Sequence, residues 1–175
     1  AVAEALGRAA REIGFFYVAG HGVPAHLIDE VFARAAVFFA LPTAEKETLS
    51  IRLSPHNRGY VGMEGESLDP SKPADLKEAF NIGLDLAADD PRVVAGGIFR
   101  GVNLWPVLPG WRTTMLGYFD AVWGLGRRLH EAIALDLGLP ETFFVDKLDE
   151  PLALLRLLHY PPQPLRAEGG QIGAG

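Results

Sequence analysis

The spacing of hydrophobic residues along the 175-residue chain predicts several helices. Residues 1–13 are rich in alanine and carry their larger apolar residues on one face. From residue 111 to residue 137 apolar side chains recur every three or four positions, and a glycine and a proline then end the pattern. Further helices are predicted from Pro24 to Phe39, after Pro42, and around residues 141–147.

Other segments have the composition or alternation of strands. Residues 77–86 alternate, with Phe80 and Ile82 on one side and smaller or polar residues on the other, which predicts a half-buried strand. Strands are also predicted at residues 15–19 (FFYVA) and 152–160, and irregular connections at residues 50–75 and 101–110.

Composition limits the class of protein. Hydrophobic residues make up 49% of the chain, which suits one globular domain or part of a larger one. The net charge of -6 argues against a nucleic-acid partner, because an acidic surface repels phosphates. No apolar run approaches the ~20 residues that span a bilayer, and no signal peptide is visible, so we expect no membrane partner. The absence of cysteine is consistent with a cytoplasmic location.

The five histidines show no metal-binding pattern. None begins an H-x-D, H-x-E or H-x-H pair, and no two are four residues apart on a helix. We therefore predict structural roles for all of them, with hydrogen bonds in a turn for the one that lies between two glycines. The five are His21, His26, His56, His130 and His159.

The strand predicted at residues 152–160 separates its polar residues by face. Alternation places Arg156 and Tyr160 on one face and His159 on the other. An arginine and a phenol on one apolar face suit a ligand carboxylate, held by the guanidinium and the hydroxyl. The alternative is that Arg156 pairs with a carboxylate of the protein and Tyr160 caps a core.

Five motifs in order resemble a known family. They are GFFYVAGHGVP (14–24), RGYVGMEGESLD (58–69), DLKEAFNIG (75–83), GVNLWP (101–106) and LRLLHYPPQP (155–164). Together they are similar to the N-terminal part of the isopenicillin N synthase-like family of non-haem Fe(II), 2-oxoglutarate-dependent dioxygenases.

The resemblance implies an α+β fold. Residues 1–110 would form the N-terminal region of the dioxygenase. Residues 111–175 would form a backing helix and the start of a double-stranded β-helix, or jelly roll, cut off before its metal-binding half. The unfinished sheet leads us to expect that the isolated chain aggregates or dimerises.

The resemblance also implies Fe(II) as cofactor and 2-oxoglutarate as cosubstrate. O₂ and a small organic molecule would be the other partners, and the product would be hydroxylated or desaturated. The family's two-histidine, one-carboxylate iron site lies later in its sequences, so we expect the iron ligands beyond Gly175 and predict that the 175-residue chain alone is inactive.

Some ligand-binding residues of the family have counterparts here. The resemblance implies that Tyr160 and Arg156 contact 2-oxoglutarate, and that Arg58, Tyr60 and Phe80 lie near the substrate, although loop anchoring and core packing explain these last three equally well. Two further alternatives remain open. One is an iron oxidase of the same family that does not use 2-oxoglutarate. The other is a non-catalytic binding module.

Overall fold

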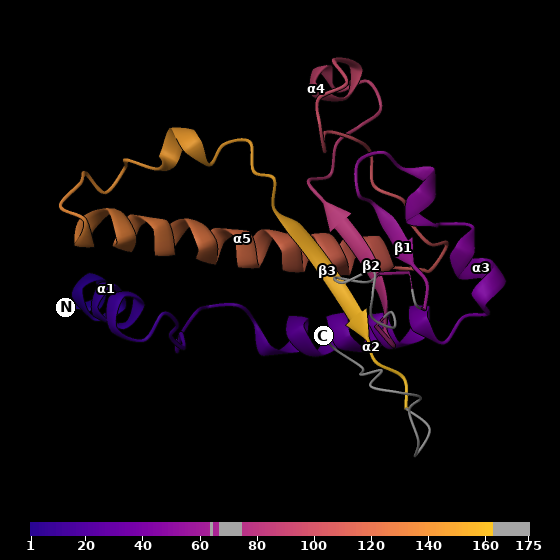
Figure 1. Ribbon diagram of the computed structural model, residues 1–175, viewed down its shortest axis with the longest axis horizontal. Helices are drawn as coiled ribbons and strands as arrows, with labels where there is room; N and C mark the ends of the chain where they lie inside the picture. Colours follow the sequence, from indigo (N-terminus) through magenta and orange to yellow (C-terminus); the bar gives the residue numbers. More distant parts are fainter. Residues whose placement is uncertain (64, 67–74, 163–175) are drawn as a thin grey trace. The chain divides into compact units, whose positions relative to one another are not determined.

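The computed structural model describes residues 1–63, 65–66 and 75–162. The chain forms two compact units. One combines Ala1–Val31 with Thr113–Pro151, and the other combines Phe32–Arg112 with Leu152–Gly175. Helices α2 (Ala25–Phe39) and α5 (Trp111–Asp136) each contribute residues to both units (Figure 1).

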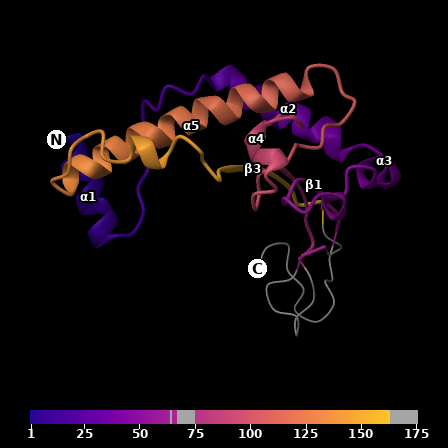
Figure 2. The ribbon, with the colours of Figure 1, turned by 90° about the horizontal axis from the view of Figure 1, so that it is seen from above.

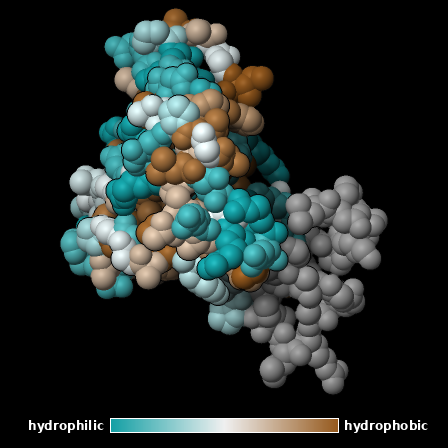
Figure 3. Space-filling view, turned by 90° about the vertical axis from the view of Figure 1, so that its left-hand side faces the viewer, coloured by the Kyte–Doolittle hydropathy of each residue, from teal (hydrophilic) through white to brown (hydrophobic). Residues whose placement is uncertain are grey.

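The first unit is helical, as its periodicity predicts. Helix α1 (Val2–Glu12) ends where Gly14 adopts a left-handed backbone conformation, with φ of 89°. Arg11 of α1 forms an ion pair with Asp136 near the end of α5, with 2.5 Å between Nη1 and Oδ2. The helix predicted around residues 141–147 is instead a turn followed by the short 3₁₀ helix η2 (Val145–Lys147). Apolar side chains remain at the surface among polar ones (Figure 3).

The strand predicted at residues 15–19 does not form. This segment has no regular secondary structure in the described chain, and its aromatic side chains are exposed, Tyr17 almost completely. Aromatic and β-branched residues favour a strand only where another strand offers hydrogen bonds, and no described strand pairs with this segment. The prediction from composition was therefore wrong for the described structure.

The second unit contains an antiparallel sheet of three strands. These are β1 (Gly59–Val61), β2 (Glu78–Gly83) and β3 (Leu154–His159), and β2 lies in the middle (Figure 1; Figure 2 labels β1 and β3). The sheet joins three separate parts of the chain, because β2 pairs with β1 on one side and with β3 on the other. Strand β3 confirms the strand predicted at residues 152–160, with slightly narrower limits.

Aromatic side chains cover one face of this sheet. Phe38 of α2 is fully buried and meets Phe80 of β2 edge-on, with 4.8 Å between ring centroids. Tyr60 of β1 and Trp111 at the start of α5 also pack against the Phe38 ring, at 6.0 and 5.7 Å. This cluster is the core of the second unit.

Strand β2 is buried on both faces, and the prediction of a half-buried strand was wrong. Its polar face carries Asn81 and Gly83, and the guanidinium of Arg58 lies directly over Gly83. A long side chain from a neighbouring loop therefore shields the face that alternation assigned to solvent.

Strand β1 lies inside residues 50–75, which were predicted to be irregular. Its first residue, Gly59, has φ of 105°, and an added Cβ would lie 2.3 Å from the carbonyl oxygen of Leu49. Glycine is required there because of both the backbone conformation and this close approach. The N–H of Tyr60 donates to that same carbonyl at 2.7 Å, which fixes where β1 enters the sheet.

The remaining elements are short. Helices α3 (Thr43–Glu47) and α4 (Pro91–Val94) and the 3₁₀ helix η1 (Ile51–Leu53) lie in the second unit. Residues 101–110 form an irregular connection, as predicted. In it Asn103 extends the end of β2, because its side-chain amide accepts from the Gly83 N–H at 2.8 Å and donates to the Gly83 carbonyl at 2.9 Å. No helix in the described ranges is long and apolar enough to cross a membrane.

Candidate functional site

Arg156 lies on the outer face of β3. Its guanidinium forms an ion pair with Glu66, a residue 90 positions away in the sequence. The alternative stated from the sequence, that Arg156 pairs with a carboxylate of the protein, is therefore what the structure shows. Both side chains keep about a third of their surface exposed, at 34% and 35%, so water screens the pair.

Tyr160 follows directly after β3 and is exposed. Its hydroxyl makes no hydrogen bond to any other residue that the structure describes, so it does not cap a core there. Leu154 and Leu158 share the outer face with Arg156 and are also exposed. This face of β3 is thus an apolar surface that carries a guanidinium and a phenol.

Asn81 is the neighbour of Arg156 across the sheet. The two residues are register partners in β2 and β3, so their side chains start from the same face. Asn81 is almost completely buried, and its amide donates to Asn57 Oδ1 at 3.1 Å. Asn81 was not among the site residues predicted from the sequence, although the alternation of residues 77–86 places it on the face opposite Phe80.

Arg58 is buried and anchors a loop. Its guanidinium donates to the backbone carbonyls of His56 at 2.7 Å and Phe99 at 3.0 Å. Burial, and secondarily the nearby charge of Arg100, lower the pKa of this guanidinium. Arg58 reaches the same face of the sheet as Asn81, because it lies over Gly83.

Tyr60 and Phe80 lie on the opposite face, inside the aromatic core. Their exposed fractions are 1% and 0%, and they are register partners in the sheet. The five residues selected from the sequence therefore do not form one site. Arg58, Arg156 and Tyr160 belong to the outer side of the sheet, and the other two belong to the core.

A polar network, buried except at His159, lies on the core face of the sheet. Glu78 Oε2 accepts from Lys46 Nζ and from the Tyr60 hydroxyl, each at 2.6 Å. Glu78 Oε1 lies 2.8 Å from His159 Nδ1. Lys46 also donates to the carbonyl of Phe39 at 3.0 Å, and the Phe39 ring stacks on His159. Each of these four polar side chains thus has a defined partner.

This network shifts two pKa values. Burial alone would raise the pKa of Glu78, but hydrogen bonds from Lys46, Tyr60 and His159 together lower it below its ordinary value. Burial, followed by the hydrogen bond to Glu78, raises the pKa of the Tyr60 hydroxyl. The network is therefore built around an ionised Glu78 and a neutral Tyr60.

His159 is a structural residue of this network, as predicted. A carboxylate only accepts hydrogen bonds, so Nδ1 must carry the hydrogen toward Glu78. Two further histidines have the predicted structural roles. His21 Nδ1 accepts from the Val23 N–H at 3.1 Å within a turn, and His130 Nδ1 lies 2.8 Å from the Gly126 carbonyl. The described residues include no group of three His, Asp or Glu side chains placed to hold a metal ion.

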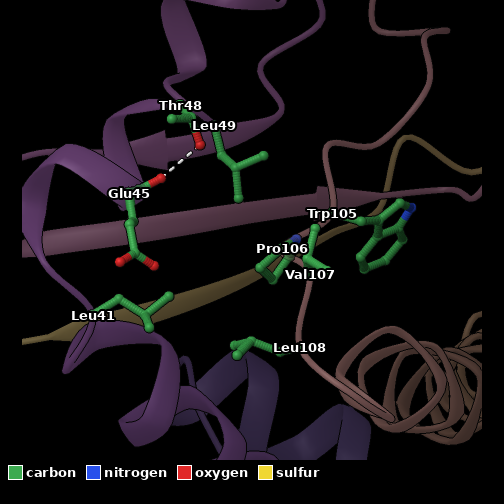
Figure 4. Close-up of a pocket in the computed structure, with 8 residues that line it drawn as sticks. All are labelled: Leu41, Glu45, Thr48, Leu49, Trp105, Pro106, Val107 and Leu108. Carbon is green, nitrogen blue, oxygen red and sulfur yellow. Dashed lines mark hydrogen bonds between the residues drawn. The ribbon is translucent and has the colours of Figure 1, made fainter.

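A separate surface pocket of about 200 Å³ lies between α3 and the 101–110 connection (Figure 4). Its walls are mainly apolar, and Glu45 is its one charged residue; the Thr48 hydroxyl donates to the Glu45 carbonyl at 2.6 Å. None of the site residues selected from the sequence lines it. The lining residues are Leu41, Glu45, Thr48, Leu49, Trp105, Pro106, Val107 and Leu108.

Residues 1–107 match the family model described as "non-haem dioxygenase in morphine synthesis N-terminal". The chain therefore belongs to the non-haem dioxygenase family, as its motifs indicate. It is 36% identical over 155 residues to the 2-oxoglutarate-Fe(II) type oxidoreductase hxnY of Emericella nidulans, covering 86% of this chain and 44% of that protein. It is 39% identical over 144 residues to azadirone synthase of Melia azedarach, covering 80% of this chain and 42% of that protein.

Solved structures agree with this assignment. A 2OG-Fe(II) oxygenase family protein from Caulobacter crescentus has a TM-score of 0.82 and 29% identity, covering 95% of this chain and 53% of that chain. A Neurospora crassa protein solved in complex with α-KG and thymine has a TM-score of 0.72 and 29% identity, covering 91% and 49%. The chain thus spans about half the length of the relatives that it matches.

Proposed function

We propose that this chain is the N-terminal portion of a 2-oxoglutarate- and Fe(II)-dependent dioxygenase that hydroxylates or desaturates a small organic molecule with O₂. The family match over residues 1–107 carries the proposal. The likeness to oxygenase structures, and to the Neurospora crassa protein bound to α-KG, supports it. Residues 1–110 would form the N-terminal region, and residues 111–175 would begin the jelly-roll domain.

Arg156 and Tyr160 are the proposed contacts of the cosubstrate. A guanidinium binds a carboxylate through parallel charge-assisted hydrogen bonds, and a phenol adds one more donor. The two residues are four positions apart, or about 13 Å between Cα atoms in extended chain, and both side chains are long enough to lean toward a shared ligand. The exposed Leu158 between them would line its carbon chain.

The described residues do not fit the iron. They offer no set of three His, Asp or Glu ligands, and the sequence contains no H-x-D or H-x-E pair. When bound, the iron would activate O₂, the oxidant of this reaction class, and 2-oxoglutarate would supply two of the electrons as it is converted to succinate and CO₂. We assign to this chain the task of binding and orienting the cosubstrate. Arg58 and Asn81 lie on the same side of the sheet as Arg156, and that side would face the substrate. Tyr60 and Phe80 would support that side from the core.

The proposal is tested by following succinate. We expect the whole protein that contains this chain to release succinate from 2-oxoglutarate when Fe(II), O₂ and substrate are supplied, and Arg156→Gln to weaken its use of 2-oxoglutarate. Arg52→Gln, which removes an exposed arginine of the same unit, is the matched control. Substrate oxidation without succinate would instead identify an oxidase independent of 2-oxoglutarate, and no turnover with any cosubstrate would favour a binding module.

A further inference from the structure

Glu66 pairs with the guanidinium of Arg156, the group that the proposed function assigns to binding 2-oxoglutarate. Its carboxylate oxygen Oε2 pairs with Arg156 Nη2, and a ligand carboxylate bound in the two-pronged manner through Nη2 would compete for that donor. A guanidinium edge binds one carboxylate in the two-pronged manner, so the two carboxylates compete for it. A ligand carboxylate can therefore bind Arg156 in the two-pronged manner through this donor only if the contact with Glu66 breaks.

The backbone of the chain holds Glu66 in that position. The N–H of Asp75, a buried residue, donates to the Glu66 carbonyl at 3.1 Å. The N–H of Gly65 donates to the Gly62 carbonyl at 3.0 Å, and an added Cβ on Gly65 would meet that carbonyl at 2.8 Å. The carboxylate of Glu66 is thus presented to β3 by an anchored backbone.

A second cation is placed to receive Glu66. Lys77 Nζ lies 3.8 Å from Glu66 Oε2, and the same ammonium already pairs with Asp75. When a ligand takes Arg156, Glu66 keeps a positive neighbour within ion-pair distance. The ligand carboxylate then neutralises Arg156, and Glu66 and Asp75 share Lys77, which leaves the cluster with one more negative charge than before.

We propose that Glu66 is a competing internal carboxylate that sets the affinity of Arg156 for its ligand, and that Lys77 accepts Glu66 when the ligand binds. This inference rests on the proposed role of Arg156 in binding the cosubstrate. The expected effect on ligand affinity is modest, because exposed ion pairs are weak. Removing the Glu66 carboxylate should tighten ligand binding about two- to fivefold.

The test is a mutant cycle in the whole protein with 2-oxoglutarate as the probe, measured by equilibrium dialysis with the radiolabelled compound. Glu66→Gln should lower the dissociation constant about two- to fivefold. Lys77→Gln should raise it in the wild-type background and leave it unchanged in the Glu66→Gln background, because no carboxylate then needs to be received. Asp89→Asn removes the same negative charge from an exposed site of the same unit and should change little.

The outcomes separate this inference from the proposed function. Binding that Arg156→Gln weakens but Glu66→Gln leaves unchanged would overturn the competition and keep the arginine as the ligand contact. Binding that Arg156→Gln does not affect would overturn both. A purely structural role for Glu66, as the partner that holds the Arg156 side chain in place, predicts that Glu66→Gln weakens binding, the opposite sign to the competition.

Discussion

Replacing Glu78 by leucine should destabilise the protein by about 3–5 kcal/mol. The change leaves the Lys46 ammonium buried with the Phe39 carbonyl as its only described acceptor, and it removes the partner of the Tyr60 hydroxyl. An unpaired buried charge carries its full desolvation cost. Urea unfolding at pH 7 measures the loss.

The matched control is the double variant Lys46→Met with Glu78→Leu. Removing both charges takes away the desolvation cost together with the ion pair, so most of the lost stability should return.

The dependence of stability on acid pH gives a second measurement. The pKa of Glu78 is lower in the folded state, so its contribution is present above the ordinary carboxyl pKa and is lost as pH falls through the folded value. The double variant should lack that acid-dependent part. Equal losses in the single and double variants would contradict this account.

Phe38→Ala should cost about 3–5 kcal/mol of folding stability. Its ring is completely buried and contacts four other aromatic rings, which come from α2, β1, β2 and the start of α5. Removing it leaves a cavity in a close-packed core, which the neighbouring rings cannot fill without leaving their present contacts. Denaturant unfolding of the variant measures this loss.

Phe32 provides the comparison for this prediction. It lies in the same helix, but 73% of it is exposed, so Phe32→Ala should change stability by no more than about 0.5 kcal/mol. Comparable losses at the two positions would show that the aromatic cluster is not the stabilising core of this unit.

The helices α1, α2 and α5 and the faces of β3 could be predicted from the sequence because each has a clear periodic pattern. Alternation put His159 on the side opposite Arg156, and the register confirms it, since Arg156 pairs with Asn81 and His159 lies opposite Glu78. Strand β1 could not be predicted in this way. It has three residues, and a left-handed glycine and a contact with Leu49 fix it in place.

The site depended on contacts between distant residues, which no local pattern shows. Glu66 and Arg156 are 90 positions apart, and Lys46 and Glu78 are 32 apart. Strand composition at residues 15–19 misled for the same reason, because a strand needs a partner that the segment itself does not reveal. The resemblance implied that Tyr60 and Phe80 lie near the substrate, but it could not reveal that both are buried. Their burial results from aromatic rings of α2 and α5 that pack against the sheet.

The central claim is that the outer face of β3 binds 2-oxoglutarate. It is tested most directly by titrating 2-oxoglutarate into protein labelled at its leucine methyl groups and following the NMR signals of this strand. We predict that the signals of Leu154 and Leu158, beside Arg156, shift with added ligand, and that those of Leu155 and Leu157 on the core face stay unchanged. Shifts confined to the core-face leucines, or no shift of either pair at saturating 2-oxoglutarate, would contradict the claim.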